Sequence, residues 1–298
     1  MKSALSVLMI FCCHATQVSA QSTESSAPAT AKPNKAPQFR EVIYGHKDGL
    51  ALTFDVLEPF VEHNGAAVVF MVSGGWRSKW VPPAQEQILL APYLEAGYRV
   101  FAVRHGSSPR YSIAEAVADV RLAIRVIRKD AKRYDIDPER MGVVGMSAGG
   151  HLTLMLATTG DDGDPQAKDL VARQSSRIAA GVALVPPSDI TGYIWSTPGL
   201  HPRYRGFPGL DIPKEDAKAV SPLYFVTPDD APCLIVMGGK DELVPAEQGE
   251  WIHEKMDEIG VENKLIVYPD ADHGLGSDRA TAMDESLKWF SKHLLAPK

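Results

Sequence analysis

The stretch MGVVGMSAGG, residues 141–150, decides the fold expected for this chain. Its first four residues are apolar, as in a buried strand, and the Ala- and Leu-rich residues after Ser147 favour a helix. Between them, Gly145-Met-Ser-Ala-Gly149 has the G-x-S-x-G pattern of a nucleophile elbow, which needs this strand-to-helix context. The turn is tight, so the residues that flank it can have almost no side chain. We therefore expect Ser147 to project at the end of a strand, with the N–H of Ala148 at a helix N-terminus.

Outward from the elbow, apolar runs alternate with segments of helical spacing. The run at 66–72 is continuously apolar, as in a strand buried on both faces, and 113–134 carries the apolar stripe of an amphipathic helix. This alternation predicts the α/β class: a mostly parallel sheet with helices on both faces and an active site beyond the carboxyl ends of the strands. Strands are expected at 39–44, 50–57, 66–72, 99–103, 141–145, 178–185, 232–237 and 264–268, and helices at 85–96, 113–134, 148–158, 246–259 and 281–294.

A serine hydroxyl needs a base, and in such folds the acid and then the histidine follow the serine along the chain. Asp241 comes shortly after the strand expected at 232–237, and His273 comes shortly after the strand expected at 264–268. Both therefore belong at carboxyl ends, in the order that a Ser-Asp-His triad requires. The sequence predicts Ser147 as nucleophile, His273 as base and Asp241 as the group that orients the base.

Other polar residues are weaker candidates for these roles. Glu242 would point away if Asp241 faces inward, and Asp270 and Asp272 flank the histidine too closely to orient it. Cys233, the one cysteine after residue 20, is interpreted as a small residue of a buried strand. Six other histidines show no partner in the sequence or fall on helices: His46, His63, His105, His151, His253 and His293.

A transition state with a developing oxyanion needs preplaced donors, and the segment Ser73-Gly-Gly-Trp76 follows the strand at 66–72. Glycines let a backbone approach a substrate closely, so Gly74 and Gly75 are expected to donate together with the N–H of Ala148. The alternative is an ordinary turn between a strand and a loop.

The segment 186–231 interrupts the alternation and is rich in Pro, Gly and aromatic residues. An excursion of this length inside a domain predicts a functional loop or lid, and the alternative is a surface insertion without contact to substrate. The substrate-binding candidates are aromatic and lie in this excursion or beside the expected oxyanion loop: Trp76, Tyr193, Trp195, Tyr204 and Phe207.

The N-terminus predicts export. Lys2, an apolar run and the small residues before Gln21 indicate a signal peptide over 1–20, and the Ser-, Ala- and Pro-rich residues 21–38 predict a disordered linker. The folded domain is expected over 39–298, and the mature protein is expected to be secreted or periplasmic. A net charge of −6 without a basic run argues against a nucleic-acid partner, and no segment reaches the roughly 18 apolar residues of a membrane span.

With these motifs in place, the chain resembles the hormone-sensitive-lipase-like and bacterial feruloyl and acetyl-xylan esterase-like (BD-FAE-type) carboxylesterases of the α/β-hydrolase superfamily. The resemblance spans about residues 39–295. It implies hydrolysis of a small-molecule or polysaccharide-linked ester without a cofactor, by the triad and donors named above. The family usually has His-Gly-Gly where this chain has Ser73-Gly-Gly75. The matching segments are Gly74-Gly-Trp76, Gly145–Gly149 with Gly150-His-Leu152, Ala219-Val-Ser-Pro222, Asp241-Glu-Leu-Val-Pro245 and Asp272-His-Gly274.

Two other functions stay open at this point. A prolyl-oligopeptidase-like serine peptidase shares the elbow and the triad order, although the chain has no room for a propeller domain before Phe39. A non-catalytic binding protein could use the same fold with the aromatic excursion gripping a ligand.

Overall fold

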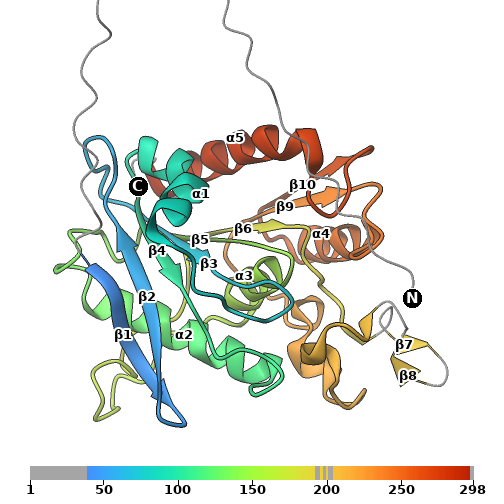
Figure 1. Ribbon diagram of the computed structural model, residues 1–298, viewed down its shortest axis with the longest axis horizontal. Helices are drawn as coiled ribbons and strands as arrows, with labels where there is room; N and C mark the ends of the chain where they lie inside the picture. Colours follow the sequence, from blue (N-terminus) through green and yellow to red (C-terminus); the bar gives the residue numbers. More distant parts are fainter. Residues whose placement is uncertain (1–38, 192–194, 197–198, 201–203, 296–298) are drawn as a thin grey trace, which may run out of the picture. The chain divides into compact units, whose positions relative to one another are not determined.

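A mixed sheet forms the centre of the fold (Figure 1). The computed structural model describes residues 39–191, 195–196, 199–200 and 204–295, and within them the sheet has eight strands in the order β1-β2-β4-β3-β5-β6-β9-β10. The β1–β2 and β2–β4 pairs are antiparallel and the other pairs are parallel. The expected signal peptide and linker lie outside the described residues. The strands are β1 (Phe39–Lys47), β2 (Leu50–Leu57), β3 (Ala67–Met71), β4 (Arg99–Val103), β5 (Met141–Met146), β6 (Ala180–Leu184), β9 (Cys233–Gly238) and β10 (Asn263–Tyr268).

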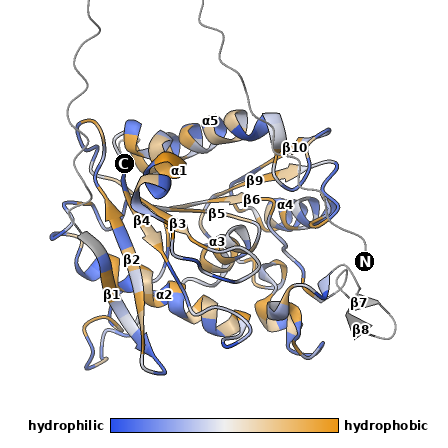
Figure 2. Cartoon of the chain, viewed as in Figure 1, coloured by the Kyte–Doolittle hydropathy of each residue, from blue (hydrophilic) through white to orange (hydrophobic). Residues whose placement is uncertain are grey.

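Helices cover both faces of the sheet, and Figure 2 shows apolar residues along its central strands. Helices α2, α3 and α4 share one core with Val69 and Ile235, and α1 and α5 share the other with Val68 and Leu234. Adjacent residues of one strand thus serve opposite cores, as the pleat requires. No helix within the described residues is long and apolar enough to cross a membrane. The helices are α1 (Pro83–Glu95), α2 (Ile113–Lys129), α3 (Ala148–Thr159), α4 (Glu247–Ile259) and α5 (Arg279–Phe290), which continues as a π-helix, η6 (Ser291–Leu295).

The expected fold class is confirmed, and the elements fall where the apolar pattern places them, with one clear difference. Helix α2 ends at Lys129, although its apolar pattern was expected to continue as helix to residue 134. Tyr134 is buried all the same, and its ring packs edge-on against Phe54 and Phe101. The apolar spacing therefore continues into the turns after the helix, because those turns also cover the core.

The excursion at 186–231 is fixed to the body of the domain where it leaves the sheet. The N–H groups of Ser188 and Asp189 both donate to Oε1 of Gln248 on α4, at 2.7 and 2.8 Å. The hydroxyl of Ser221 accepts from the N–H of Ile190 at 2.7 Å. The described elements of the excursion are a hairpin of two short strands and three short 3-10 helices: β7 (Trp195–Ser196), β8 (Gly199–Leu200), η2 (Pro208–Leu210), η3 (Ala217–Val220) and η4 (Pro222–Tyr224).

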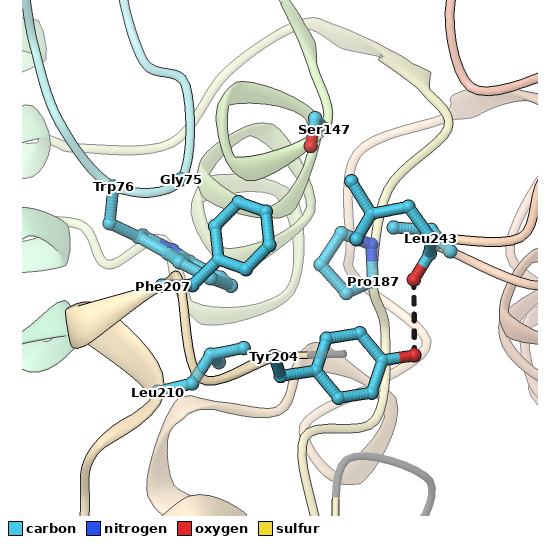
Figure 3. A pocket seen from close by; sticks show the side chains of 9 residues that line it. Gly75, Trp76, Ser147, Pro187, Tyr204, Phe207, Leu210 and Leu243 are labelled. Atoms are coloured by element: carbon cyan, nitrogen blue, oxygen red, sulfur yellow. Dashed lines mark hydrogen bonds between the residues drawn. The ribbon is translucent and has the colours of Figure 1, made fainter. Parts of the chain in front are cut away.

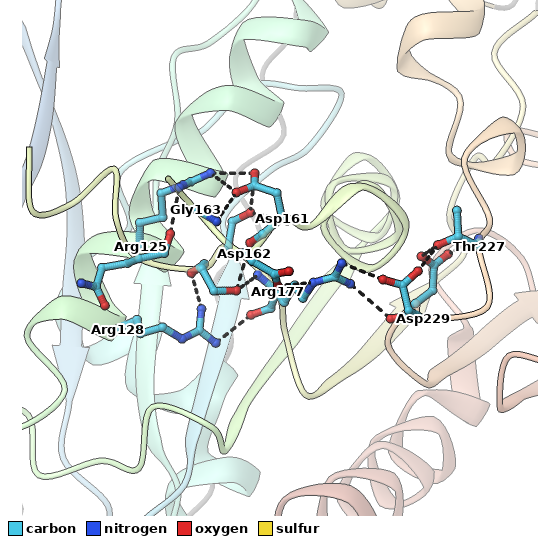
Figure 4. A network of polar contacts seen from close by, with 12 residues as sticks. Arg125, Arg128, Asp161, Asp162, Gly163, Arg177, Thr227 and Asp229 are labelled. Atoms are coloured by element: carbon cyan, nitrogen blue, oxygen red, sulfur yellow. Dashed lines mark hydrogen bonds and ion pairs between the residues drawn. The ribbon is translucent and has the colours of Figure 1, made fainter. Parts of the chain in front are cut away.

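A polar network fixes the loop that joins α3 to β6 (Figure 4). Arg125 of α2 holds both carboxylate oxygens of Asp161, at 2.5 and 2.6 Å. Arg177 bridges Asp162 and Asp229, at 2.7 Å to each. Because this loop leads into the start of β6, the network lies at the edge of the sheet opposite the carboxyl ends of the parallel strands. It anchors a loop away from the expected site.

Candidate active site

The elbow holds Ser147 in a strained backbone conformation. Its φ is 55° and its ψ is −120°, and a positive φ is uncommon for a residue other than glycine. A Cβ on Gly145 would lie 2.3 Å from the carbonyl group of Gly149, and a Cβ on Gly149 would lie 2.9 Å from the carbonyl oxygen of Met71. Neither position accepts a side chain, which confirms the reason given for both glycines. The N–H of Ser147 donates to the Leu184 carbonyl at 2.8 Å and ties the elbow to β6.

Ser147, His273 and Asp241 form a continuous hydrogen-bonded chain. Nε2 of His273 lies 2.9 Å from Oγ of Ser147, and its Nδ1 lies 2.7 Å from Oδ2 of Asp241. Oδ1 of Asp241 accepts the N–H groups of Leu243 and Val244, each at 2.8 Å, so the carboxylate is held from both sides. An ionised carboxylate only accepts, so Nδ1 carries the proton and Nε2 is left to accept from the serine hydroxyl. This arrangement can remove the proton of Ser147.

The rival acids and His253 make other contacts or face solvent. Asp270 pairs with Lys240 at 2.6 Å, Asp272 accepts the N–H of Gly274 at 2.8 Å, and Glu242 is exposed. His253 contacts Asn263, whose Oδ1 lies 2.5 Å from its Nδ1. The three residues expected to form the triad are therefore the ones that the ends of β5, β9 and β10 bring together.

The segment after β3 folds as a tight two-residue turn. The N–H of Arg77 donates to the Gly74 carbonyl at 3.1 Å, and the N–H of Gly74 donates to the Arg77 carbonyl at 3.0 Å. Gly75 and Trp76, at the centre, have φ values of 57° and 55°, the signature of a type I′ turn. This corrects the expectation for Gly74, because its N–H is committed to Arg77 and is not free for an oxyanion. Gly75, which lines the pocket beside Ser147, and Ala148, the first residue of α3, remain candidate donors.

Ser73, which stands where the family usually has histidine, is hydrogen-bonded to a histidine that lies just after the neighbouring strand β4. Nδ1 of His105 lies 2.8 Å from the Gly106 carbonyl, and its Nε2 lies 2.9 Å from Oγ of Ser73. A carbonyl only accepts, so Nδ1 carries the proton and Nε2 accepts from the Ser73 hydroxyl. Burial lowers the pKa of His105, which keeps the ring neutral and able to accept.

Trp76 is anchored in a similar way by His151 on α3. Its indole N–H donates to Nδ1 of His151 at 3.2 Å, and Nε2 of His151 lies 2.7 Å from the Val220 carbonyl in the excursion. Complete burial lowers the pKa of His151 to about 4. A positive φ costs a bulky residue about 1–3 kcal/mol, and burial of Trp76 together with this hydrogen bond offsets the cost. Trp76 thus has a structural contact beyond the expected substrate-binding role.

A small apolar pocket opens beside Ser147 (Figure 3). The space available to the centre of a water molecule is about 20 Å³, little more than the roughly 10–15 Å³ that one water needs. A Cβ on Gly75 would lie 2.8 Å from the Phe207 ring, so this ring packs directly on the turn. The Tyr204 hydroxyl donates to the Leu243 carbonyl at 3.1 Å. The lining residues are Gly75, Trp76, Ser147, Pro187, Tyr204, Phe207, Leu210, Leu243 and Val244.

The pocket divides the expected substrate-binding residues into two groups. Trp76, Tyr204 and Phe207 line it, so the described part of the excursion forms one of its walls. Tyr193 lies outside the described residues, and Trp195 is described only through its backbone pairing with Leu200.

Two features bear on other chemistry. The described residues contain no group of three or more His, Cys, Asp and Glu side chains arranged to hold a metal ion. Cys233 is buried, and burial raises the pKa of its thiol to about 12. That thiol stays protonated, which agrees with its interpretation as a core residue.

With this geometry in view, comparison with known proteins decides the family. The chain belongs to the BD-FAE family. The family profile matches residues 54–256, more than half of the chain. The family and the α/β-hydrolase fold indicated by the sequence motifs are thus confirmed.

Known relatives agree with this assignment. The chain is 26% identical over 244 residues to the probable carboxylic ester hydrolase LipM of Mycobacterium tuberculosis, covering 78% of this chain and 55% of LipM. It spans about half the length of LipM and less of other curated relatives, such as esterase LipQ. Apo esterase 2 of Thermogutta terrifontis is 26% identical, with a TM-score of 0.69 over 89% of this chain and 99% of that one. The acetyl ester-xyloside bifunctional hydrolase of Caldicellulosiruptor lactoaceticus shares the fold at 21% identity, with a TM-score of 0.73 over 88% and 99%. LipM and esterase 2 are ester hydrolases by name, the enzyme class that the sequence indicated.

The sequence patterns did not indicate that His105 contacts the site or that Leu243 and Val244 form the aliphatic wall of the pocket. His105 follows β4 closely, so its place at the carboxyl edge of the sheet was the available signal. Leu243 and Val244 lie two and three residues after Asp241, and their N–H groups hold its carboxylate while their side chains line the pocket. Because these residues hold the acid through their backbone, they are brought to the site with it.

Replacing Gly145 with alanine tests the elbow. The new methyl group would meet the Gly149 backbone at 2.3 Å, and neither strand nor helix can yield easily. We expect Gly145→Ala to lower the free energy of unfolding by about 1–3 kcal/mol or more and to abolish esterase activity. Gly206→Ala is the matched control, because a Cβ there meets nothing within 4 Å. Equal urea midpoints for the two variants would contradict this account of the elbow.

Buried neutral His151 should make stability depend on pH. The folded-state pKa is about 4, against 6.5 for the free side chain, so the unfolded chain takes up the proton first as pH falls. The contribution is present above pH 6.5 and is lost as pH falls toward 4. Between pH 7 and pH 4, the free energy of unfolding should fall by on the order of 3 kcal/mol more in the wild type than in His151→Asn. Parallel urea titrations measure this, and identical pH slopes would show that His151 does not titrate as described.

Proposed function

We propose that this protein is a serine esterase that hydrolyses short-chain carboxylic esters through an acyl-enzyme. The observation that carries the proposal is the chain of hydrogen bonds from Ser147 through His273 to Asp241, opening on a small apolar pocket. Membership of the BD-FAE family and similarity to named esterases support the same activity.

The proposed reaction has two steps of acyl transfer. His273 takes the hydroxyl proton as Ser147 attacks the ester carbonyl, and Asp241 stabilises the imidazolium that forms. The N–H groups of Gly75 and Ala148 receive the negative charge that develops on the carbonyl oxygen. The alcohol leaves with the proton from His273. Water, activated by the same imidazole, then releases the acid and restores Ser147.

The size of the pocket favours a short acyl group. The space open to the centre of a water molecule is about 20 Å³, which suits a group as small as methyl, and a longer chain would meet the Phe207 ring where it packs on Gly75. Acetyl esters are therefore the proposed substrates. We also propose that the protein is exported after removal of residues 1–20 and acts on acyl groups carried by polysaccharide. N-terminal sequencing of the exported protein and acetate release from acetylated xylan test these two points.

Replacing the nucleophile tests the activity itself. We expect Ser147→Ala to lower kcat for p-nitrophenyl acetate by roughly 10⁴- to 10⁶-fold without loss of fold. Circular dichroism and thermal unfolding of the variant provide the control. In the wild type, a fluorophosphonate should form an adduct on Ser147. An unlabelled Ser147 in folded protein would favour a non-catalytic binding protein, and faster turnover of an aminoacyl-proline amide than of the ester would favour a peptidase.

Removing the Phe207 ring tests the acyl preference. Phe207→Ala should raise the ratio of kcat/KM for p-nitrophenyl butyrate over acetate by roughly tenfold, because two further methylene groups gain about 0.8 kcal/mol each when buried. Phe225→Ala is the matched control, since Phe225 lies in the same excursion but lines a different hollow. A ratio that stays at the wild-type value in Phe207→Ala would place the acyl group elsewhere.

A further inference from the structure

Two histidines outside the proposed triad contact the two ends of the segment Ser73–Trp76, which contains the centre of the turn. His105 is 5% exposed and His151 is fully buried. They come from different elements, the segment after β4 and the first turn of α3, and they approach the turn independently. Each ring has one nitrogen on a backbone carbonyl and the other on a side chain of the turn.

The two rings act in the same way through opposite tautomers. His105 donates from Nδ1 to its carbonyl and accepts from Ser73 at Nε2. His151 donates from Nε2 to its carbonyl and accepts from the Trp76 indole at Nδ1. In each case the carbonyl determines which ring nitrogen is left without a proton, and that nitrogen accepts a hydrogen bond from a side chain of the 73–76 segment.

Neither ring belongs to the proton path of the proposed reaction. Burial disfavours the charged form of both, and the ionisable groups that act on His105 are Asp119 and Lys47, with opposing effects on its pKa. The site therefore contains one imidazole placed to exchange a proton with Ser147 and two that are held as permanent acceptors.

The segment that carries His105 also holds the turn through neighbouring contacts. The N–H of Ser108 donates to the Trp76 carbonyl at 3.0 Å, and the hydroxyl of Ser107 accepts the N–H of Ser78 at 2.8 Å. The segment 105–108 thus runs beside 73–78 and contacts it at several points. Gly75, the candidate donor that lines the pocket, lies between the Ser73 and Trp76 anchors in the chain.

We propose that His105 and His151 are positioning residues of the oxyanion hole, which hold the turn from both ends so that the Gly75 N–H stays directed at the site of Ser147. This inference rests on the proposed function. Oxyanion donors stabilise the transition state only when they are already in place, and a displacement near 1 Å can cost about a hundredfold in rate. The positive φ of Trp76 strains the turn, and the two anchors oppose its relaxation.

Small deletions at the turn test the inference. Ser73→Ala removes the hydroxyl donor, and Trp76→Phe removes the indole N–H while keeping an aromatic ring. We expect each to lower kcat for p-nitrophenyl acetate by roughly 10- to 100-fold with KM within about threefold, because the loss falls on the transition state. Wild-type kcat in both variants, or a loss carried by KM, would overturn the inference.

Exchanges at His105 separate positioning from general packing. His105→Leu removes the acceptor and should match Ser73→Ala, whereas His105→Gln places an amide oxygen near the position of Nε2 and should recover most of the lost kcat. The double variant Ser73→Ala/His105→Leu should be no slower than the worse single variant, because each substitution removes the same hydrogen bond. Strictly multiplicative losses, or no recovery with glutamine, would contradict a positioning role. His253→Gln, on α4 and away from the turn, controls for replacement of a half-buried histidine.

Hydrogen exchange gives a readout that does not depend on activity. The peptide covering 73–78 should exchange its amides faster in Ser73→Ala and in Trp76→Phe than in the wild type, while a peptide from β5 stays unchanged. If the wild type lacks esterase activity but this difference is found, the proposed function fails and the anchoring stands. If the wild type is active and exchange at 73–78 is unaffected, the positioning inference fails alone.

Discussion

The close approach of two backbone segments at Gly145 and Gly149 is the constraint on which the site depends. It forces the chain to reverse within the elbow and puts Ser147 at a φ of 55°. Such strain persists only where the surroundings over-determine the conformation. Here β5 is paired on both sides, the Ser147 N–H is bonded to β6, and α3 is buried along nearly its whole length. The centre of the sheet therefore fixes the position of Ser147, and the loops after β9 and β10 supply its hydrogen-bond partners.

Three histidines serve the site, and their surroundings decide which of them can react. His273, His105 and His151 each fix a tautomer by donating from one ring nitrogen and accepting at the other. The side chain of His273 is 26% exposed and contacts the carboxylate of Asp241. The other two histidines contact neutral backbone carbonyls in buried positions, where burial disfavours a charge. The proposed division into one base and two fixed acceptors therefore rests on burial and on the charge of one neighbour.

Most of the fold, and the meeting of Ser147, Asp241 and His273, could be predicted because both follow from patterns local to the chain. A buried strand followed by a glycine-flanked serine predicts the elbow, and parallel strands bring Asp241 and His273 to the same edge. The hydrogen bond between Ser73 and His105 could not be predicted from the sequence. It joins the segments that follow β3 and β4, and no local pattern shows that these two strands are neighbours in the sheet. The expected role of Gly74 as an oxyanion donor was wrong for a different reason. The N–H groups of two consecutive glycines look equivalent in a sequence, and only the turn type shows that the N–H of Gly74 bonds to Arg77. The predicted end of α2 was too late, because Tyr134 still covers the core after the helix has ended at Lys129.

The excursion links the proposed acyl pocket to the turn proposed to hold the oxyanion donor. Its Phe207 ring packs on Gly75, and a Cβ on Gly209 would lie 3.3 Å from the Trp76 indole. Its Val220 carbonyl holds the ring of His151, which in turn receives the indole N–H. One segment therefore shapes the acyl pocket and supports the proposed donor at the same time. A change in the excursion that enlarges the pocket also removes packing from the turn, so a broader acyl range and a well-held oxyanion are in conflict at these residues. The short acyl preference proposed for this enzyme follows from the same contacts that keep its turn in place.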